Sequence, residues 1–485
     1  MASSGVPLLI DSLIDSNEQG SWIRSPIEEL DIAGNMIWAN DIGCLTNLFK
    51  PASDSLVKLV LSSNPIGADG LKTLSQSLSN LRNLEDLDIS STYAGERGTT
   101  YVLEPLAFLE NLKTLKLKDN TIPGETSVML DISPLDRIVS PGVACGVNWV
   151  SCGLAFVIET GLWRSISTLD LGQNPMCAQG MHIFSKGLIA CNIVTLTDLS
   201  LSNNKINADG ATHLAEALSR VGHGMLRLSL AKNMISSEGM IALAKPLHNM
   251  SKLEHLLLTE NGITETGGMA LGNSLIHLFN LTSFSIGRNP IKNEGTTSII
   301  IGLQNSFDSL EALDVSICHF DGPNLSVPIS AGLARMKSLK ELNMEGDALN
   351  LQGLSHITSA LTITKFNLVT LNLGGVQMYA DGAKLLSGVL IQFRYLKDLG
   401  IGYNKLGDHG LKMILPALHE CASISYLGLQ HNNLGPTSIF LLADFILKSA
   451  NLVQVLLYGN NIHYGPNGLT PLASCRHKVT WDTDV

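Results

Sequence analysis

Apolar residues recur along this chain at a spacing much longer than the period of a helix or a strand. The pattern LxxLxLxxNxI, in which the L and I positions are apolar, returns every 28 to 30 residues. Positions within one copy are counted here as offsets from its first apolar residue. The copies begin at Ile27, Leu56, Leu84, Leu112, Ile166, Leu196, Met225, Leu253, Leu281, Leu310, Leu339, Leu368, Leu396, Ile424 and Leu452. A sequence repeated at this period indicates a solenoid, because one such segment cannot bury its apolar face alone.

One step between consecutive copies is nearly twice as long as the others. From Leu112 to Ile166 there are 54 residues, which equals two steps of 27. This predicts a degenerate repeat at about residues 139–165, and Gly153 falls where its register requires a glycine. We therefore expect about 16 repeats over residues 27–478. Residues 1–26 would form an N-terminal cap or flexible tail, and residues 479–485 a C-terminal tail.

Two residue types keep a constant phase. Asparagine stands at offset eight in 11 repeats, and glycine stands at offset 14 in 11 repeats. Besides Asn35, the predicted structural asparagine ladder consists of Asn64, Asn120, Asn174, Asn204, Asn233, Asn261, Asn289, Asn404, Asn432 and Asn460. The glycines are Gly70, Gly98, Gly153, Gly180, Gly210, Gly239, Gly267, Gly295, Gly353, Gly382 and Gly410.

Each repeat is interpreted as a strand, a turn and a helix. The LxLxx segment alternates like a short strand with inward leucines. An inward asparagine amide can both donate and accept hydrogen bonds, so it can satisfy turn backbone that water does not reach. Glycine at offset 14 allows either a positive φ or close packing where the helix begins. Apolar residues such as Leu214 and Leu218 follow at helical spacing.

This chain resembles the leucine-rich repeat family, in its long-repeat, ribonuclease-inhibitor-like class. The segments NKINADG and NKLGDHG, with the 28-residue period, carry the resemblance, which covers more than nine-tenths of the chain. The class also includes Ran GTPase-activating proteins and the repeat regions of NOD-like receptors. The resemblance implies an α/β solenoid shaped like a horseshoe, with parallel strands on the concave face and helices on the convex face.

Five repeats depart from the asparagine rule. They carry Thr92, Val147, Cys318, Asp347 and Val376 at offset eight. Threonine and aspartate can still accept hydrogen bonds, whereas valine cannot; the resemblance implies that cysteine is a frequent substitute. The degenerate repeat at 139–165 bends the solenoid, forms a hinge or partner site, or reflects an error in the gene structure, and the sequence leaves these alternatives open.

Outward positions of the strands, at offsets four, six and seven, carry mostly small polar residues such as Ser200, Ser202 and Asn203. The last repeats differ, and their partner-binding candidates are Tyr403, Tyr426, Gln430, His431 and Tyr458. Tyrosines on a face of small residues suit a protein anchor, and they equally suit a cover for the end of the stack.

Charged residues gather on the same face near the N-terminus. The acidic ones are Glu28, Glu29, Asp31, Glu85, Asp86 and Asp88, and the next repeat has Lys113, Lys116 and Lys118. We interpret these charges as solvating the strands rather than as a binding site.

Composition narrows the classes of function. A net charge of −11 disfavours nucleic-acid binding, which needs clustered Lys and Arg. Eight cysteines without a CxxC pair disfavour disulfide and zinc frameworks and favour reduced thiols in the cytoplasm. The N-terminal residues lack the basic start of a signal peptide. Residues 143–163 are apolar, but their glycines, Asn148 and Glu159 favour buried core over a membrane span.

Motifs of catalysis are not found in the sequence. There is no GxxxxGK[ST], HExxH or GxSxG. His213, His248 and His277 fall in different repeats, where single histidines are usually solvated or satisfied in the core. We expect no catalytic residues, no metal and no cofactor.

The sequence therefore predicts a non-enzymatic, cytoplasmic scaffold for protein–protein interaction. It would bind a protein partner on the concave face and would not bind nucleic acid or membranes. The alternative, which the resemblance admits, is a GTPase-activating protein for a Ran-type small GTPase, since such activators place one polar residue in a partner's site. Partner identity, pathway and oligomeric state are not determined by the sequence.

Overall fold

The protein was examined as a computed structural model. The structure describes residues 9, 14–17, 20–23, 26–106, 108–120, 165–320, 322–364, 367–462, 472 and 477–480. Two compact parts divide the chain, and they are called here the N-terminal half (Met1–Leu253) and the C-terminal half (Glu254–Val485). The predicted repeat at 139–165, apart from its last residue, and the apolar stretch 143–163 lie outside the described residues.

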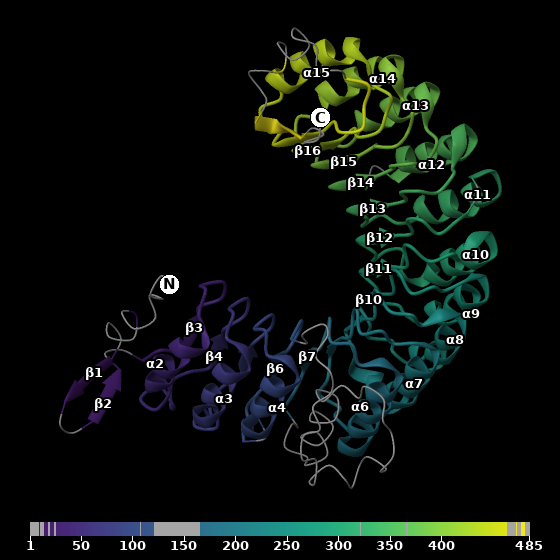
Figure 1. The fold of residues 1–485 in the computed structure, drawn as a ribbon. Coiled ribbons are helices and arrows are strands. Elements are labelled where there is room, and N and C mark those ends of the chain that lie inside the picture. The colour runs from purple at the N-terminus through teal and green to yellow at the C-terminus, as the bar shows by residue number, and fades with distance from the viewer. Residues whose placement is uncertain are drawn as a thin grey trace. The chain divides into compact units, whose positions relative to one another are not determined.

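The N-terminal half is built from parallel strands, most of which are followed by a described helix (Figure 1). Its strands pair in chain order: β3 (Glu29–Asp31), β4 (Lys58–Val60), β5 (Asp86–Asp88), β6 (Thr114–Lys116), β7 (Thr168–Asp170), β8 (Asp198–Ser200) and β9 (Arg227–Ser229). Its helices are α2 (Ala39–Phe49), α3 (Gly67–Leu78), α4 (Gly95–Leu106), α6 (Cys177–Cys191), α7 (Ala208–Val221), the 3-10 turn η1 (Gly222–Gly224) and α8 (Ser236–Leu247). Before them, β1 (Ile14–Asn17) and β2 (Gly20–Ile23) form an antiparallel pair within the segment expected to be a cap or tail.

The C-terminal half repeats the same arrangement. Its parallel strands are β10 (His255–Leu257), β11 (Ser283–Ser285), β12 (Ala312–Asp314), β13 (Glu341–Asn343), β14 (Thr370–Asn372), β15 (Asp398–Gly400), β16 (Tyr426–Gly428), β17 (Gln454–Leu456) and β18 (Val479–Thr480). Its helices are α9 (Glu265–Leu275), α10 (Lys292–Gly302), the 3-10 turn η2 (Leu303–Ser306), α11 (Gly322–Leu333), α12 (Asn350–Thr364), α13 (Tyr379–Leu390), α14 (Gly407–Glu420) and α15 (Pro436–Lys448). Strand β18 extends the sheet into residues expected to be a tail, because Leu457 N donates to Thr480 O at 3.0 Å and Gln454 Nε2 to Thr480 Oγ1 at 2.8 Å.

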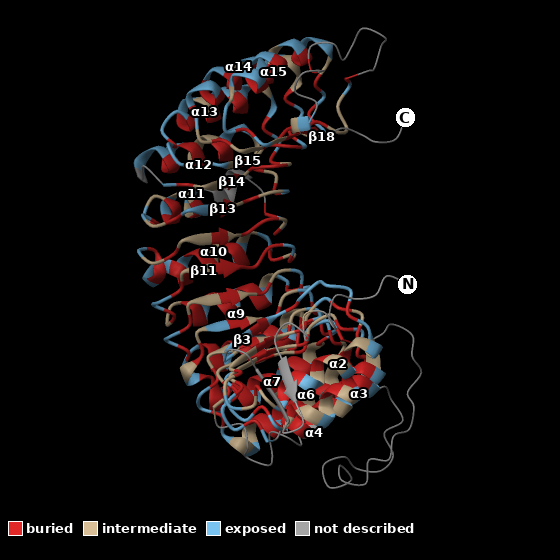
Figure 2. Ribbon diagram, turned by 90° about the vertical axis from the view of Figure 1, so that its left-hand side faces the viewer, coloured by how far each residue is buried: buried red, intermediate tan, exposed pale blue. Residues whose placement is uncertain are grey.

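The core of each half lies between its strands and its helices. In each strand the leucine or other apolar residue at offset three is buried, and its neighbours are less so, because successive side chains alternate between faces. Helix α7 shows the matching device: Asn207 Oδ1 caps the helix by accepting from Gly210 N at 3.0 Å, while Leu214 and Leu218 are buried. Figure 2 shows this buried layer between the two faces. Among the described helices, none has the length and apolar character needed to cross a bilayer.

Glycine at offset 14 serves close packing rather than a positive φ. The described glycines at this offset lie in the first turn of their helices, and several of them lie against the helix of the preceding repeat. A Cβ on Gly98 would lie 2.9 Å from Ala68 Cα, and a Cβ on Gly239 would lie 3.1 Å from Ala208 Cα. Side chains at this offset would therefore push adjacent helices apart.

The described strands on either side of the long step between Leu112 and Ile166 are in contact. Strand β6 pairs directly with β7, with Leu115 opposite Leu169. Backbone bonds join the same two strands, such as Ser167 N to Lys113 O at 2.9 Å. The repeat predicted within this step lies outside the described residues and stays a prediction.

Most asparagines at offset eight are buried between repeats, and five of them share one full bonding pattern. In Asn64, Oδ1 accepts from the backbone N–H of Asn35 (2.8 Å) and Ile37 (3.1 Å), and Nδ2 donates to the carbonyls of Ile32 (2.8 Å) and Leu61 (2.9 Å). Asn233, Asn289, Asn432 and Asn460 make the same kinds of bond to their own and the preceding repeat. Each amide thus satisfies two buried N–H and two buried C=O groups.

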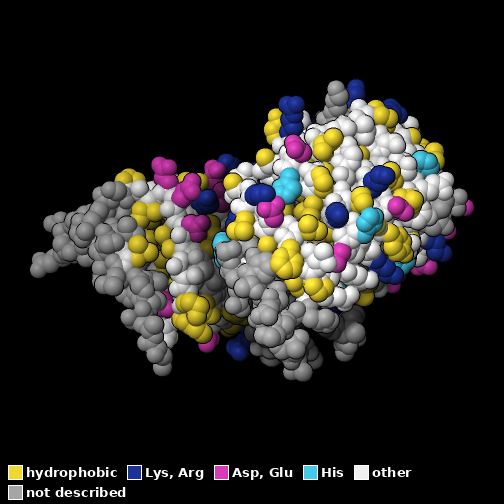
Figure 3. Space-filling view, turned by 90° about the horizontal axis from the view of Figure 1, so that it is seen from above, with side chains coloured by type: hydrophobic (Ala, Val, Ile, Leu, Met, Phe, Trp, Pro, Cys, Tyr) yellow, Lys and Arg dark blue, Asp and Glu magenta, His cyan; other side chains and the backbone are white. Residues whose placement is uncertain are grey.

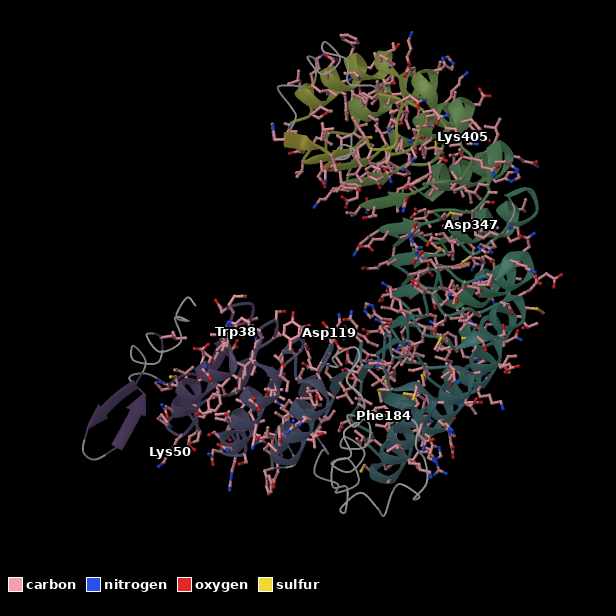
Figure 4. All side chains as sticks on the ribbon, in the orientation of Figure 1. Trp38, Lys50, Asp119, Phe184, Asp347 and Lys405 are labelled. Carbon is pink, nitrogen blue, oxygen red and sulfur yellow. The ribbon has the colours of Figure 1, made fainter. Side chains whose placement is uncertain are left out.

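Three consecutive repeats of the C-terminal half interrupt this ladder. Cys318 Sγ lies 3.8 Å from Ile286 O, and Val376 has no polar side-chain atom. Between them, Asp347 is 1% exposed and accepts from the backbone N–H of Cys318 (3.1 Å) and Phe320 (3.2 Å). Asp347 lies on the helix side of the strands (Figure 4). When ionised, its carboxylate lacks the donors that an asparagine would offer to the neighbouring carbonyls.

A second polar series closes the opposite edge of the repeats and was not foreseen from the sequence. Serine, threonine or asparagine just before the first apolar residue donates to a carbonyl of the preceding repeat. Examples are Ser55 to Ile27 O, Asn83 to Asp54 O, Asn111 to Arg82 O, Thr195 to Ile166 O, Ser309 to Leu281 O and Asn451 to Ala422 O, all at 2.7–3.0 Å. These residues recur at one phase of the sequence, so the signal was present there.

Candidate functional site

The strand face of each half is formed by the outward side chains that alternate with the buried leucines. Small side chains dominate it, and several bond to one another: Ser202 Oγ lies 2.6 Å from Ser229 Oγ. Of the outward residues Ser200, Ser202 and Asn203, Ser202 is thus hydrogen-bonded to another residue of the strand face, while Asn203 lies one position farther along the turn. A face made of such residues is open and leaves room for a protein surface.

One backbone position on this face is left-handed in every described repeat. The residue at offset seven has a φ between 50° and 81° in all 15 of them. Only four of these residues are glycines, namely Gly34, Gly346, Gly375 and Gly459. The other repeats keep a side chain there, and the aromatic ones are Tyr403 (φ 59°) and His431 (φ 51°). A non-glycine residue in this region costs about 1 kcal/mol relative to ordinary backbone.

Tyr403, His431 and Tyr458 form one aromatic cluster across β15, β16 and β17. The rings of Tyr403 and His431 stack, with centroids 4.4 Å apart and planes at 18°. His431 then meets Tyr458 edge to face, at 5.5 Å and 85°. Tyr403 remains 47% exposed. The predicted aromatic residues are therefore in contact with each other and still accessible.

Tyr426, Gln430 and Tyr458 line a hollow of about 310 Å³ beside this cluster. Three glycines, Gly374, Gly400 and Gly428, are among its lining residues, and a Cβ on Gly428 would lie 3.0 Å from Gln430 Oε1. Gln430 Oε1 is buried and accepts no hydrogen bond. All five candidate residues thus lie at one place, here called the aromatic site: Tyr403, Tyr426, Gln430, His431 and Tyr458.

Two carboxylates in the same hollow were missed by the sequence reasoning. Glu345 and Asp398 line it together with Asn372, whose Nδ2 donates to Glu345 Oε2 at 3.0 Å. Glu345 stands at offset six and Asn372 at offset four, which are the outward offsets already identified. Their outward offsets are the signal in the sequence that points to them.

The electrostatics of the hollow keep its tyrosines neutral. Burial raises the pKa of Tyr426, and the negative charge of Asp398 raises it further. Burial, and then its neighbour Tyr403, raise the pKa of Tyr458. Both phenols are therefore protonated at neutral pH and offer an O–H group beside the carboxylates.

The charged residues of the N-terminal half neutralise one another across neighbouring strands. The pairs are Lys58–Glu29 (3.1 Å), Lys113–Glu85 (2.6 Å), Lys116–Asp88 (3.7 Å) and Arg227–Asp198 (2.7 Å). Exposed pairs of this kind contribute little to stability. Their alternation of sign leaves this face without the single-signed patch that a strongly charged partner needs.

Figure 3 shows charged and hydrophobic side chains interspersed over the upper surface of the C-terminal half. The described residues contain no group of three or more His, Cys, Asp or Glu side chains placed to hold a metal ion. The structure nevertheless brings His213 into contact with a histidine of the adjacent repeat, His182, which the sequence treated as separate.

The repeat identified above matches known sequences. The family described as "Leucine Rich repeat" matches residues 52–75, 193–215 and 249–272. Ribonuclease inhibitor from Mus musculus is 27% identical over 370 residues, which covers 74% of this chain and 79% of that protein. These findings support a leucine-rich repeat protein similar to ribonuclease inhibitors.

Further relatives share the same repeats. Ribonuclease inhibitor from Sus scrofa is 25% identical, with the same coverage. NACHT, LRR and PYD domains-containing protein 14 from Mus musculus is 26% identical over 51% of this leucine-rich repeat protein, but the match spans only 25% of that relative. An internalin from Listeria monocytogenes has a TM-score of 0.37 at 18% identity, covering 99% of this chain and 93% of its own, which is too low to inform on the fold.

Proposed function

We propose that this leucine-rich repeat protein is a non-enzymatic scaffold that binds a protein partner through the aromatic site on the strand face of its C-terminal half. The observation that carries the proposal is the cluster of Tyr403 and His431, two stacked and accessible rings held in left-handed backbone. Aromatic side chains of this kind are the commonest anchors of protein interfaces.

The backbone conformation at offset seven is common to the described repeats, so the side chain is what distinguishes Tyr403 and His431. Glycine would occupy this offset without strain, and four repeats use it. At Tyr403 and His431 the chain instead carries large aromatic side chains, which are suited to anchor a protein partner.

The hollow beside the rings suggests what the partner contributes. Glu345 and Asp398 supply carboxylates, and Gln430 Oε1 is a buried acceptor with no donor. A side chain rich in N–H donors, lysine or arginine, satisfies all three groups and packs on the tyrosine rings. The proposed partner therefore inserts a cationic side chain here.

Relatives guide the choice of a first partner. Two of them are named ribonuclease inhibitor, so a ribonuclease is the first protein to test. The buried free thiols of Cys318 and Cys421 support the accompanying proposal that the protein works in the cytoplasm.

The decisive experiment compares glycine substitutions at two tyrosines. Tyr403 and Tyr379 both have left-handed backbone (φ 59° and 50°) and similar exposure (47% and 48%), but Tyr379 lies at the start of α13 and not in the aromatic site. Partners captured by the immobilised wild-type chain are identified, and their affinity is measured for Tyr403→Gly, Tyr458→Ala and Tyr379→Gly. We expect at least a tenfold loss for the first two variants and none for Tyr379→Gly.

Equal affinity of the wild type and the two site variants would refute the aromatic site. The scaffold proposal itself is tested separately, by adding the protein to a Ran-type GTPase loaded with GTP and measuring phosphate release. Acceleration of hydrolysis would replace the scaffold by the GTPase-activating alternative.

A further inference from the structure

Where the asparagine ladder is complete, it ties each repeat to the next through a buried carbonyl at offset five. Ile401 O accepts from Asn404 Nδ2 of its own repeat at 3.2 Å and from Asn432 Nδ2 of the next repeat at 2.8 Å. Water does not reach these groups, so the amides are their only source of hydrogen bonds. The carbonyl at offset five therefore depends on offset eight of its own repeat and of the following one.

Two such carbonyls lose their amide donors where three consecutive repeats lack the asparagine. Val315 O depends on Cys318 and Asp347. Met344 O depends on Asp347 and Val376. The thiol of Cys318 is directed to carbonyls of two other residues, and valine has no hydrogen to donate. A protonated Asp347 could serve one of the two carbonyls and no more. Val315 and Met344 are both fully buried.

The backbone does not replace these donors. At offset six of the following repeats, the N–H of Glu345 donates to Asn343 Oδ1 at 3.2 Å and that of Gly374 donates to Asn372 Oδ1 at 3.1 Å. Among the described residues, no backbone N–H outside the strands is bonded to either carbonyl. A buried acceptor without a donor destabilises the folded chain, because water would satisfy it in the unfolded one. The junctions of β12 with β13 and of β13 with β14 are therefore weaker than those beside them.

A hollow of about 560 Å³ lies over the turns of the same repeats. Its lining includes His319, Phe320, Gly346 and Asp347. The hollow brings solvent to the edge of the two weak junctions. Only a small local movement is then needed before water can reach the two carbonyls, which favours opening at this place over opening elsewhere in the array.

The junction of β13 with β14 also divides the hollow of the aromatic site. Glu345 lies just after β13, whereas Asp398 and Tyr426 lie on β15 and β16. On the strand face the junction is bridged by Asn372 Nδ2, which donates to Glu345 Oε2 at 3.0 Å. Beyond this junction the ladder resumes, because Asn404 Nδ2 donates to the carbonyl at offset five of the β14 repeat at 2.7 Å.

We propose that the repeat containing β13 is a gate of the aromatic site: its junction with β14 opens while the neighbouring repeats stay folded, and this withdraws Glu345 from the hollow. Repeats of a solenoid contact only their neighbours, so one weak junction can open by itself. A cationic side chain bound between Glu345 and Asp398 holds the junction closed. The inference rests on the proposed function, since it concerns the control of the same site.

Hydrogen exchange of the full chain tests the gate without any partner. Met344 N and Gly346 N donate across the junction of β13 with β14 at 3.0 and 2.8 Å, whereas Ile401 N donates across the junction of β15 with β16 at 3.0 Å. We expect protection factors at least tenfold lower for the first two amides than for Ile401 N. Fraying from the C-terminal end of the sheet would give the opposite order, because Ile401 lies nearer that end.

Restoring the ladder supplies the matched variants. Val376→Asn and Asp347→Asn each introduce an amide that can donate to Met344 O. At pH 7.5 each variant should raise the protection factors of Met344 N and Gly346 N at least tenfold. Thr92→Asn makes the same kind of change at offset eight of the N-terminal half and is the control, which should leave both amides as they are in the wild type.

Arginine amide is the probe for the link to the aromatic site. A ligand that binds only the closed form stabilises it, so exchange of Met344 N and Gly346 N should slow several-fold as arginine amide is added. Citrulline amide has nearly the same shape without the charge and is the control. It should slow the exchange much less, because Glu345 and Asp398 attract the cation.

Three results overturn the gate. They are equal protection of Met344 N, Gly346 N and Ile401 N in the wild type, unchanged protection in both ladder variants, and the same exchange with arginine amide as with citrulline amide. The capture experiment with the tyrosine variants is independent of all three, so the proposed function can stand when the gate fails. Conversely, capture that does not depend on Tyr403 would refute the aromatic site, while rapid exchange at Met344 N would still show the weak junction.

Discussion

Replacing Asp347 by asparagine should stabilise the C-terminal half, and by more as the pH rises. Burial raises the pKa of this carboxyl from 3.8 to about 7, and Asp314 adds to the effect, although backbone N–H groups of Cys318 and Phe320 oppose it. The folded protein thus holds a proton on Asp347 that the unfolded chain has released. Between these two pKa values, stability falls as the pH rises, because the unfolded state binds fewer protons.

The size of the effect follows from the difference between the two pKa values. Each pKa unit corresponds to about 1.4 kcal/mol. From pH 5 to pH 8 the wild-type protein should lose about 2–3 kcal/mol of stability through this one group. Asparagine does not titrate, its Oδ1 can accept the same two N–H groups, and its Nδ2 can donate to nearby carbonyls as the other ladder residues do. The advantage of Asp347→Asn should therefore grow by about 2–3 kcal/mol over this range.

Hydrogen exchange is the suitable assay, since repeat arrays need not unfold in one step. Protection factors for the amides around Cys318 and Phe320 would be compared in wild type and Asp347→Asn at pH 5, 6.5 and 8. Asp381→Asn, at an exposed position in the first turn of α13, is the control for loss of a carboxylate that is not buried.

A difference between wild type and Asp347→Asn that stays constant from pH 5 to pH 8 would refute the reasoning. So would a variant that is less protected than wild type at pH 8. Either result would mean that the carboxylate is ionised and well solvated in the folded protein.

Three further outcomes are expected. Asn432→Ala should lower the free energy of unfolding by about 3 kcal/mol or more in urea denaturation, because it leaves four buried backbone groups without partners. Gly98→Ala should lower the melting temperature, because the added Cβ would meet the preceding helix. Gly388→Ala should instead raise the melting temperature: no atom lies within 4 Å of the added Cβ, and the higher helix propensity of alanine is worth up to about 1 kcal/mol. Burial acts to raise the pKa of the Asp408 carboxyl, but hydrogen bonds from Ser438 and Gly435 at the start of α15 lower this pKa below its ordinary value. The stabilising contribution of Asp408 is therefore present above the pKa of the unfolded chain and is lost as the pH falls. Asp408→Asn should flatten the acid side of the curve of stability against pH.

The sequence predicted the α/β solenoid because one residue pattern fixes both the strand and its burial. Each described strand of the two parallel arrays up to β17 begins two residues after the first apolar position, as at Leu56 and β4. The predicted fold class is confirmed. The predicted repeat at about residues 139–165 stays a prediction, because two steps of 27 and an insertion of similar length look alike in one sequence and residues 121–164 lie outside the described part of the chain.

The candidate site could be predicted in part. The offsets placed Tyr403, His431 and Tyr458 on one face, and stacking of the repeats brought their rings together. The sequence could not reveal the left-handed backbone at offset seven, because most repeats hold a side chain there instead of glycine. Nor could it pair His182 with His213, since helical phase differs by one residue between their repeats. Such contacts depend on how helices rotate against each other.

The left-handed position at offset seven also has a consequence for engineering. In most interfaces, a substitution can lower affinity either because a contact with the partner is lost or because the protein is destabilised. At offset seven glycine adopts the left-handed backbone without strain. A chain with glycine at every offset seven would therefore lack all side chains at this position and should be at least as stable as the wild type. Single residues could then be introduced at offset seven, one repeat at a time, and the affinity of each variant for the partner would be compared with that of the all-glycine chain. Offset seven of each repeat can thus be varied independently of the others to measure its contribution to binding.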